Sequence, residues 1–360
     1  MGFALFAMFF GAGNLVFPLK LGVTSQENWF YSYLGFAVTG VLIPLIGFYA
    51  MSLFDGDYHA FFQPLGKKAG LASITLILLL LGPCGAVARC LALCYETVHP
   101  VWNSISLFEF SLMASVVVFL FSFRENKTIP ILGKLLTPFK LATLAFLVYQ
   151  GLFTESAPLA MPTNPSYFWM GLSEGLETLD LLAALAFSCF LCPRLKNATS
   201  GSPALKVGLI SGLLLGTIYA GFCFVAARHA SGLSSLKQEL LLISLSEYLI
   251  GPWGAKLTML VVLLACLTTV IALTAIFAEF MKKELFKDKL RYEYALAITL
   301  AMAMAVSLLR FEGIVAFLLP LMEVAYPALI VLCLAHIWQK EVRLPFFTTF
   351  GATVAYKLLA

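Results

Sequence analysis

The hydrophobic positions of the chain fall into long runs that are bounded by charged residues, prolines and glycines. A helix needs about 20 apolar residues to cross the hydrocarbon core of a bilayer. Eleven runs approach or reach that length, at 3–19, 31–53, 70–96, 106–123, 135–153, 167–192, 205–227, 255–280, 292–309, 314–337 and 345–359. They lack the period-2 alternation of β-barrel strands. The pattern therefore predicts an all-α polytopic membrane protein with about 11 transmembrane helices.

Composition agrees with this interpretation. Charged residues make up 12% of the chain and hydrophobic residues 61%, with a mean hydropathy of +0.93. A soluble domain carries about 25% charged residues, so the composition excludes a soluble protein. The net charge of +4 indicates no nucleic-acid partner. Cys189 and Cys192 form a CxxC inside a predicted span, where we interpret them as packing residues rather than metal ligands.

Lysine and arginine positions predict the orientation. With a cytoplasmic N-terminus, the inner loops receive Lys67, Lys68, Arg124, Lys127, Lys134, Arg194, Lys196, Lys206, Lys282, Lys283, Lys287, Lys289, Arg291, Lys340 and Arg343. The outer loops receive Lys20, Arg228, Lys237, Lys256 and Arg310. Because inner loops carry the excess of cationic residues, we predict that the N-terminus is cytoplasmic. A helix-like stretch at 236–250 lies in an outer loop, either as a cap over a vestibule or as an amphipathic connector.

The first and sixth spans are interrupted. Gly11-Ala12-Gly13-Asn14 divides the first span, and a stretch with three carboxylates, 173–180, occupies the outer half of the sixth. Glycine and asparagine are poor helix formers, and carboxylates at membrane depth mark functional sites. Alternatively, the acidic residues lie at the level of the outer headgroups.

The spacing of the two interruptions indicates a transporter. Span 6 follows span 1 by five spans, so it enters the membrane from the opposite side. Broken spans in corresponding positions of two inverted halves point to a central binding site. Half-helix N-termini bind anionic groups and unwound carbonyls coordinate cations, which fits an amino-acid carboxylate beside a sodium ion.

Span 8 contains two adjacent hydroxyls in an otherwise apolar helix, those of Thr268 and Thr269. Such hydroxyls are hard, neutral ligands that suit a monovalent cation. Alternatively, they donate to carbonyls one turn back, as intramembrane threonines often do.

Several stretches resemble the bacterial branched-chain amino acid:cation symporter family (BrnQ-type carriers). They are 9–18, Gly82-Pro83 with Arg89 and Glu96, 133–138, 178–187, 264–269 and Tyr326-Pro327. The resemblance implies a five-plus-five inverted-repeat transporter fold, LeuT-like and of the APC superfamily, with broken helices 1 and 6. It divides the chain into a first repeat at 1–153, a second at 154–337 and an additional transmembrane helix at 338–360.

The resemblance also implies site residues. The sodium ligands would be the carbonyls of Ala7, Phe10 and Ala265 and the hydroxyls of Thr268 and Thr269. The substrate would be bound by Gly11, Ala12, Gly13, Asn14, Gly175, Glu177, Thr178 and Asp180, with the N–H groups of Ala12 and Gly13 on its carboxylate. In related proton-coupled transporters a span-5 ammonium takes the place of sodium. Lys140 is the candidate here, unless its side chain extends to the inner headgroups.

We therefore expect a transporter that imports leucine, isoleucine and valine across the bacterial inner (cell) membrane by sodium-coupled symport. Its expected partners are the amino acid, Na⁺ and lipid, without a further cofactor, nucleic acid or obligate protein partner. The alternative is proton coupling through Lys140 or a span-6 carboxylate. A multi-pass enzyme is disfavoured because His59, His99, His229 and His336 are scattered over both faces, and a channel because no repeated filter motif is present.

Overall fold

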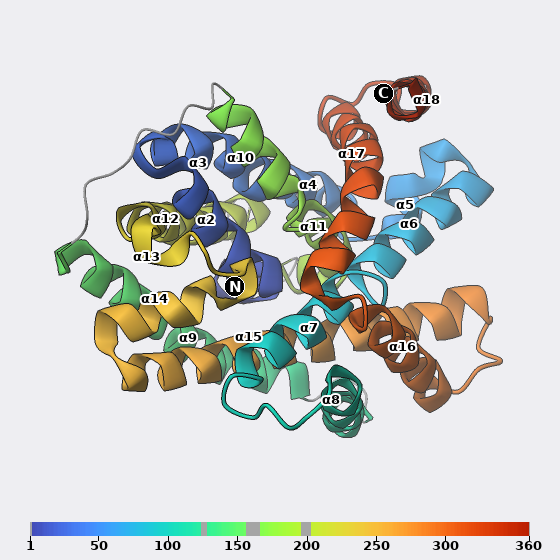
Figure 1. Ribbon diagram of the computed structural model, residues 1–360. Coiled ribbons are helices and arrows are strands. Elements are labelled where there is room, and N and C mark those ends of the chain that lie inside the picture. Colours follow the sequence, from blue (N-terminus) through green and yellow to red (C-terminus); the bar gives the residue numbers. More distant parts are fainter. Residues whose placement is uncertain (1, 124–127, 156–165, 196–202, 360) are drawn as a thin grey trace.

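The computed structural model describes residues 2–123, 128–155, 166–195 and 203–359, and the regular secondary structure of these residues is helical (Figure 1). Spans 1 to 3 are formed by α1 (Gly2–Phe9), α2 (Ala12–Ser25), α3 (Trp29–Ala37), α4 (Ile43–Ser52), α6 (Lys67–Leu81) and α7 (Ala86–Val98). Spans 4 to 6 are formed by α8 (Leu107–Ser122), α9 (Thr128–Phe153), α10 (Tyr167–Leu176) and α11 (Asp180–Leu195). The later spans are α12 (Pro203–Arg228), α15 (Pro252–Phe280), α16 (Tyr292–Ser307), α17 (Arg310–Ile337) and α18 (Arg343–Leu359).

Short helices and turns join the longer helices, either between spans or, at Val38–Leu42, within span 2. They are α5 (Tyr58–Phe62), α13 (Ala230–Leu233), α14 (Leu241–Ile250), the 3₁₀ turns Gln26–Asn28, Gln63–Leu65 and Gln238–Leu240, and the π-helical turns Val38–Leu42 and Met281–Leu285. The helix predicted at 236–250 is thus confirmed in its C-terminal part as α14, which packs along α15. Its role as a cap or connector stays open.

The apolar helices confirm the multi-pass character of the chain. Within the described residues, six helical segments are long and apolar enough to cross a bilayer, and three shorter apolar helices accompany them. Large apolar side chains are exposed on outward faces, among them Leu120, Phe153 and Leu213. Such a surface suits lipid rather than water. Among the cationic residues that predict the orientation, Arg124, Lys127 and Lys196 lie outside the described residues.

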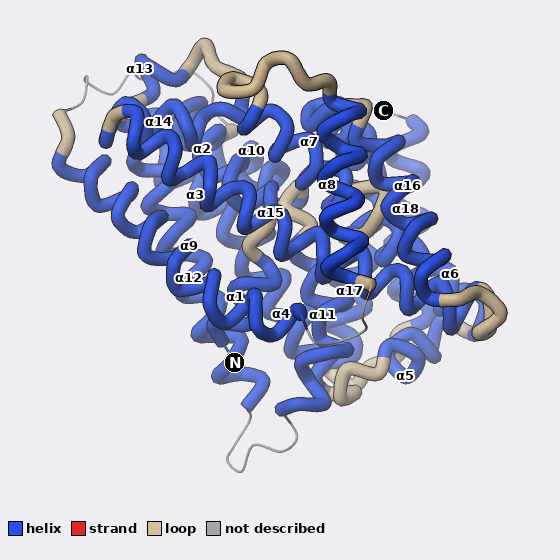
Figure 2. The backbone as a smooth tube through the Cα atoms, turned by 90° about the horizontal axis from the view of Figure 1, so that it is seen from below, coloured by secondary structure: helices blue, strands red, loops and turns tan. Residues whose placement is uncertain are grey.

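Two groups of helices pack against each other. The first group contains α1 to α4 and α10 to α12, and the second contains α6, α7, α8, α15 and α16. Figure 2 shows α5 and the N-terminus at one face of the molecule, and α13 and α14 at the other. We call these the N-terminal face and the opposite face.

Close backbone contact joins α3 and α10 within the first group. A Cβ atom added at Gly171 would lie 1.8 Å from the carbonyl oxygen of Ser32, and one at Gly35 would lie 2.0 Å from that of Phe168. Small residues allow helix backbones to approach this closely, which favours helix association in membranes.

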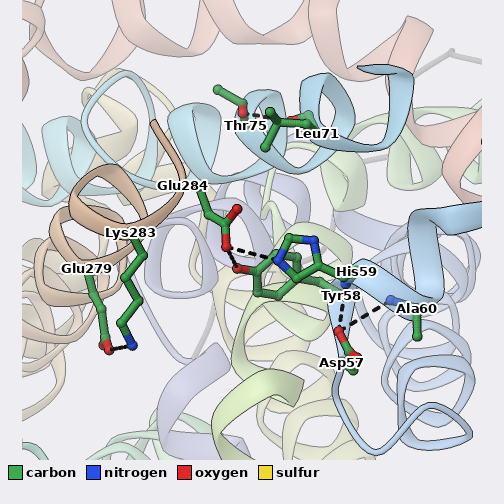
Figure 3. A network of polar contacts seen from close by, with 9 residues as sticks. All are labelled: Asp57, Tyr58, His59, Ala60, Leu71, Thr75, Glu279, Lys283 and Glu284. Atoms are coloured by element: carbon green, nitrogen blue, oxygen red, sulfur yellow. Dashed lines mark hydrogen bonds and ion pairs between the residues drawn. The ribbon is translucent and has the colours of Figure 1, made fainter. Parts of the chain in front are cut away.

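A polar network on the N-terminal face links the two groups (Figure 3). The Glu284 carboxylate, in the π-helical turn after α15, accepts from the Tyr58 hydroxyl at 2.8 Å and lies 2.9 Å from Nε2 of His59. Asp57 caps α5 by accepting the N–H groups of His59 and Ala60. Burial, together with the Glu284 carboxylate, raises the pKa of Tyr58, so its hydroxyl remains a donor at neutral pH.

Candidate functional site

The interruption of span 1 is confirmed and is shorter than the sequence predicts. Non-helical backbone is confined to Phe10 and Gly11, and Ala12, Gly13 and Asn14 form the first turn of α2. The Asn14 side chain folds back, and its Oδ1 accepts the Gly11 N–H at 3.1 Å. The N-terminal end of α2, with its partial positive charge, therefore lies in the middle of the span.

The interruption of span 6 is also confirmed, and it is limited to three residues. Helix α10 continues to Leu176, and α11 begins at Asp180. Leu179 has a φ of +64°, which is uncommon for a residue other than glycine. The Thr178 hydroxyl donates to the Gly175 carbonyl at 2.8 Å and accepts the Asp180 N–H at 3.4 Å, so it caps α11.

Span 3 contains a third interruption, which the sequence analysis missed. Residues 82–85 separate α6 from α7, so the predicted span 70–96 is two helices. The Gly82-Pro83 dipeptide was the available signal, because this pair commonly ends helices. The interruption places α7 so that Arg89 points to span 6, where its Nη1 donates to the Glu177 carbonyl.

The three interruptions lie around one small cavity between the two helix groups. It is lined from the first group by Met8, Phe9, Gly11, Ala12, Gly13, Asn14, Thr178, Asp180, Ala183 and Phe187, and from the second by Leu81, Ala86, Arg89, Cys90, Thr269 and Leu273. The space open to the centre of a water molecule is about 20 Å³, which accommodates roughly one water. Admission of an amino acid therefore requires the two groups to move apart.

A buried polar cluster joins the two broken spans beside this cavity. Asn14 Nδ2 donates to Asp180 Oδ2 at 2.7 Å and to the Tyr219 hydroxyl, which itself lies 3.5 Å from Asp180 Oδ2. All three side chains are at most 1% exposed. Tyr219 of α12 was missed by the sequence analysis, because a tyrosine in a span carries no signal of its polar partners.

The two span-8 threonines both donate to the Ala265 carbonyl, Thr268 at 2.9 Å and Thr269 at 3.0 Å. Bonds of this kind, from a hydroxyl to a carbonyl one turn back, are the alternative to cation binding that the sequence also allows. Thr269 also faces the span-1 interruption, since a Cβ added at Gly11 would lie 3.7 Å from its Oγ1. The donated hydrogens leave oxygen lone pairs available to a cation, so the ligand assignment stays a prediction.

Lys140 is buried in α9, with 2% exposure. A side chain that reached the inner headgroups would be exposed, so this interpretation is wrong for the present conformation. Its electrostatic neighbours are Cys90 of α7 and Cys266 of α15, and none of the described carboxylates forms an ion pair with it. Lys140 therefore lies near Cys266, which adjoins the proposed sodium ligand Ala265 in span 8.

Other predicted site residues lie outside the cavity lining. Gly175 packs against α3 and the following turn, where an added Cβ would lie 2.0 Å from Thr39 Oγ1. The Glu177 carbonyl accepts from Arg89, and Glu177 does not line the cavity. The cavity lining does not include Ala7, Phe10, Ala265 or Thr268.

Half-helix N-termini that meet at a central cavity, in a bundle of apolar helices, define the class of secondary transporters with the LeuT-like fold. Solved structures share this fold. Mhp1, a nucleobase-cation-symport-1 family transporter in a closed conformation with bromovinylhydantoin bound, aligns with a TM-score of 0.68 and 17% identity over 97% of this chain and 80% of that chain. The inward-facing conformation of Mhp1 aligns with a TM-score of 0.66 and 16% identity, over 95% of this chain and 77% of that chain.

The chain belongs to the branched-chain amino acid transport protein family, whose model matches residues 1–358. A Staphylococcus aureus protein, named as a branched-chain amino acid carrier, is 28% identical over 94% of this chain and 81% of its own length. A protein of the same description from Staphylococcus saprophyticus is 28% identical over 91% of this chain and 78% of its own length.

These findings confirm the family, the fold class and the prediction of a transporter rather than an enzyme. The division into repeats at 1–153 and 154–337, with an additional helix at 338–360, stays a prediction.

Proposed function

We propose that the protein imports leucine, isoleucine and valine by sodium-coupled symport with alternating access. The observation that carries the proposal is the meeting of the N-terminal ends of α2 and α11 at one cavity. Free N–H groups at such ends bind a carboxylate. The apolar lining, which includes Leu81, Ala183 and Phe187, suits a branched aliphatic side chain.

The cation site in this proposal lies between spans 1 and 8. Its ligands are the carbonyls of Ala7, Phe10 and Ala265 with the hydroxyls of Thr268 and Thr269. Support comes from the position of Thr269, which faces the interruption at Gly11 and lines the cavity. A cation held there contacts both helix groups, so its binding favours the closed arrangement and couples ion and substrate.

Proton coupling is the second candidate, and the burial of Lys140 favours it. An ammonium without a carboxylate partner is costly in an apolar environment, so this side chain can lose and regain a proton near the position proposed for sodium. The Asp180 carboxylate, fully buried between Asn14 and Tyr219, is the span-6 alternative.

Leucine uptake into proteoliposomes, with an inward sodium gradient or an inward proton gradient imposed separately, tests the two candidates. We expect uptake driven by sodium alone. Uptake driven by protons alone would reject sodium coupling and transfer the role to Lys140 or Asp180. Absence of leucine uptake under both gradients would reject the proposed function.

The proposed orientation places the N-terminal face in the cytoplasm of a bacterial cell, on the basis of the cationic loops. Labelling of single cysteines introduced at Lys67 and Lys237, with a membrane-impermeant thiol reagent in intact cells, tests it. We expect the variant at position 237 to react and the one at position 67 to be protected.

A further inference from the structure

The cavity contains one cationic and one anionic side chain, Arg89 from α7 and Asp180 from α11. Arg89 is 2% exposed and Asp180 is 1% exposed. Burial of charges is costly unless partners compensate them, yet the structure shows no ion pair of 4 Å or less between these two residues or between either and another described residue. Neither charge is therefore neutralised by an ion pair, although both side chains line the cavity.

The hydrogen bonds of Arg89 are incomplete. Its Nη1 donates to the Glu177 carbonyl, whereas its Nε has no partner among the described residues. Buried polar atoms are generally hydrogen-bonded. Because Arg89 lines the cavity, its unpaired Nε marks a position that a ligand would complete.

The Asp180 carboxylate, by contrast, is held in place by hydrogen-bond donors. Hydrogen bonds from Asn14 and Tyr219 end on its Oδ2. These donors fix the carboxylate at the start of α11, where Asp180 lines the cavity. A fixed carboxylate at a cavity suits an ammonium group.

We propose that Arg89 binds the carboxylate of the transported amino acid and that Asp180 binds its α-ammonium group, so the cavity selects zwitterionic α-amino acids. Arg89 acts beside the N-terminal end of α2, because Ala12 and Gly13 line the same cavity. The guanidinium presents several donors in a plane that matches a carboxylate. This inference rests on the proposed function and adds the groups that recognise the substrate.

Competition for radiolabelled leucine binding by the purified full-length protein tests the assignment. The competitors are leucinamide, which lacks the carboxylate, and 4-methylpentanoate, which lacks the ammonium group. We expect the wild type to bind both competitors roughly tenfold or more weakly than leucine, as the loss of a charged hydrogen bond predicts. In Arg89→Gln the preference for leucine over leucinamide should fall, while the preference over 4-methylpentanoate remains. In Asp180→Asn the preference for leucine over 4-methylpentanoate should fall, while the preference over leucinamide remains.

Two further variants separate recognition from structure. Arg228→Gln is the matched control, because this arginine donates to the Leu152 carbonyl away from the cavity, and both preferences should remain. Arg89→Lys retains the charge without the planar geometry, so its preference for leucine over leucinamide should lie between those of the wild type and Arg89→Gln, while its preference over 4-methylpentanoate remains. It also replaces Arg89→Gln in the test if that variant does not fold.

The outcomes distinguish this inference from the proposed function. The role of Arg89 would be overturned if the Arg89 variants bound leucine as tightly as the wild type does, with the same preferences over both competitors. An equal loss of affinity for leucine and for both competitors would overturn it as well. A wild-type protein that neither binds nor transports leucine would reject the proposed function, and the recognition assignment with it.

Discussion

At the residue scale, the hydrogen bonds of the span-8 threonines are compatible with two roles, a structural role within the helix and the binding of a cation. Thr268 and Thr269 each donate to Ala265, and this bond satisfies a hydroxyl in an apolar helix. The bond leaves lone pairs on both oxygens, and Thr269 directs its side chain to the interruption of span 1. Position relative to Gly11, rather than the hydrogen bond, is what distinguishes this residue from other threonines in spans.

Replacement of both hydroxyls tests the cation site. We expect Thr268→Ala with Thr269→Ala to abolish sodium stimulation of leucine uptake, because the variant loses two proposed ligands. Thr274→Ala is the matched control, since Thr274 is buried in the same helix and donates to the Val270 carbonyl one turn back without lining the cavity. Unchanged sodium stimulation in the double variant would reject the ion-site assignment.

At the element scale, the contact between α3 and α10 depends on glycine. Hydropathy identifies both helices as membrane spans but does not distinguish a face that contacts lipid from one that contacts another helix. Gly35 and Gly171 bring the two backbones together, and this contact positions the N-terminal half of span 6. The start of α11 and the cavity therefore depend on a contact outside the cavity.

A methyl group at this contact should destabilise the protein. We expect Gly171→Ala to lower stability by about 1–3 kcal/mol, as overpacking does, because the added Cβ would lie 1.8 Å from the Ser32 carbonyl oxygen. Thermal unfolding of the purified protein in detergent measures this loss as a lower midpoint. Gly351→Ala in α18 is the control, since open space surrounds that glycine. Equal midpoints for the two variants would contradict the packing argument.

At the scale of the whole molecule, the cavity lies between two helix groups, and the polar network of Figure 3 crosses between them on the N-terminal face. Segment 54–59 contacts both groups. A Cβ added at Gly56 would lie 2.5 Å from the Ser188 carbonyl of α11, and Tyr58 and His59 bind Glu284 after α15. The network therefore stabilises the contact between the two groups on this face.

Loss of the network should open the N-terminal face. We expect Glu284→Gln to increase the labelling rate of Cys189, in a protein without other cysteines, by about two- to fivefold. That factor corresponds to the ~0.5–1 kcal/mol of a partly exposed polar contact. Glu279→Gln is the matched control, because Glu279 pairs with Lys283 on the same helical segment (Figure 3). Equal labelling of the two variants would show that the network does not hold this face closed.

The sequence by itself determined the membrane spans, the interruptions of spans 1 and 6 and the family resemblance. Hydropathy, glycine content and charge distribution are local properties, and they are present in the chain before it folds. The exact extent of each interruption was not determined by the sequence, because the ends of a helix, here at Ala12 and Leu176, depend on tertiary packing as well as on local propensity.

Tertiary structure decided which polar groups meet. Asn14 and Asp180 are 166 residues apart in the chain, and Asn14 and Tyr219 are 205 apart. Arg89 reaches span 6 because span 3 is interrupted, and Lys140 is buried because neighbouring helices cover it. Such contacts depend on the approach and rotation of whole helices, which packing sets and which local sequence does not encode.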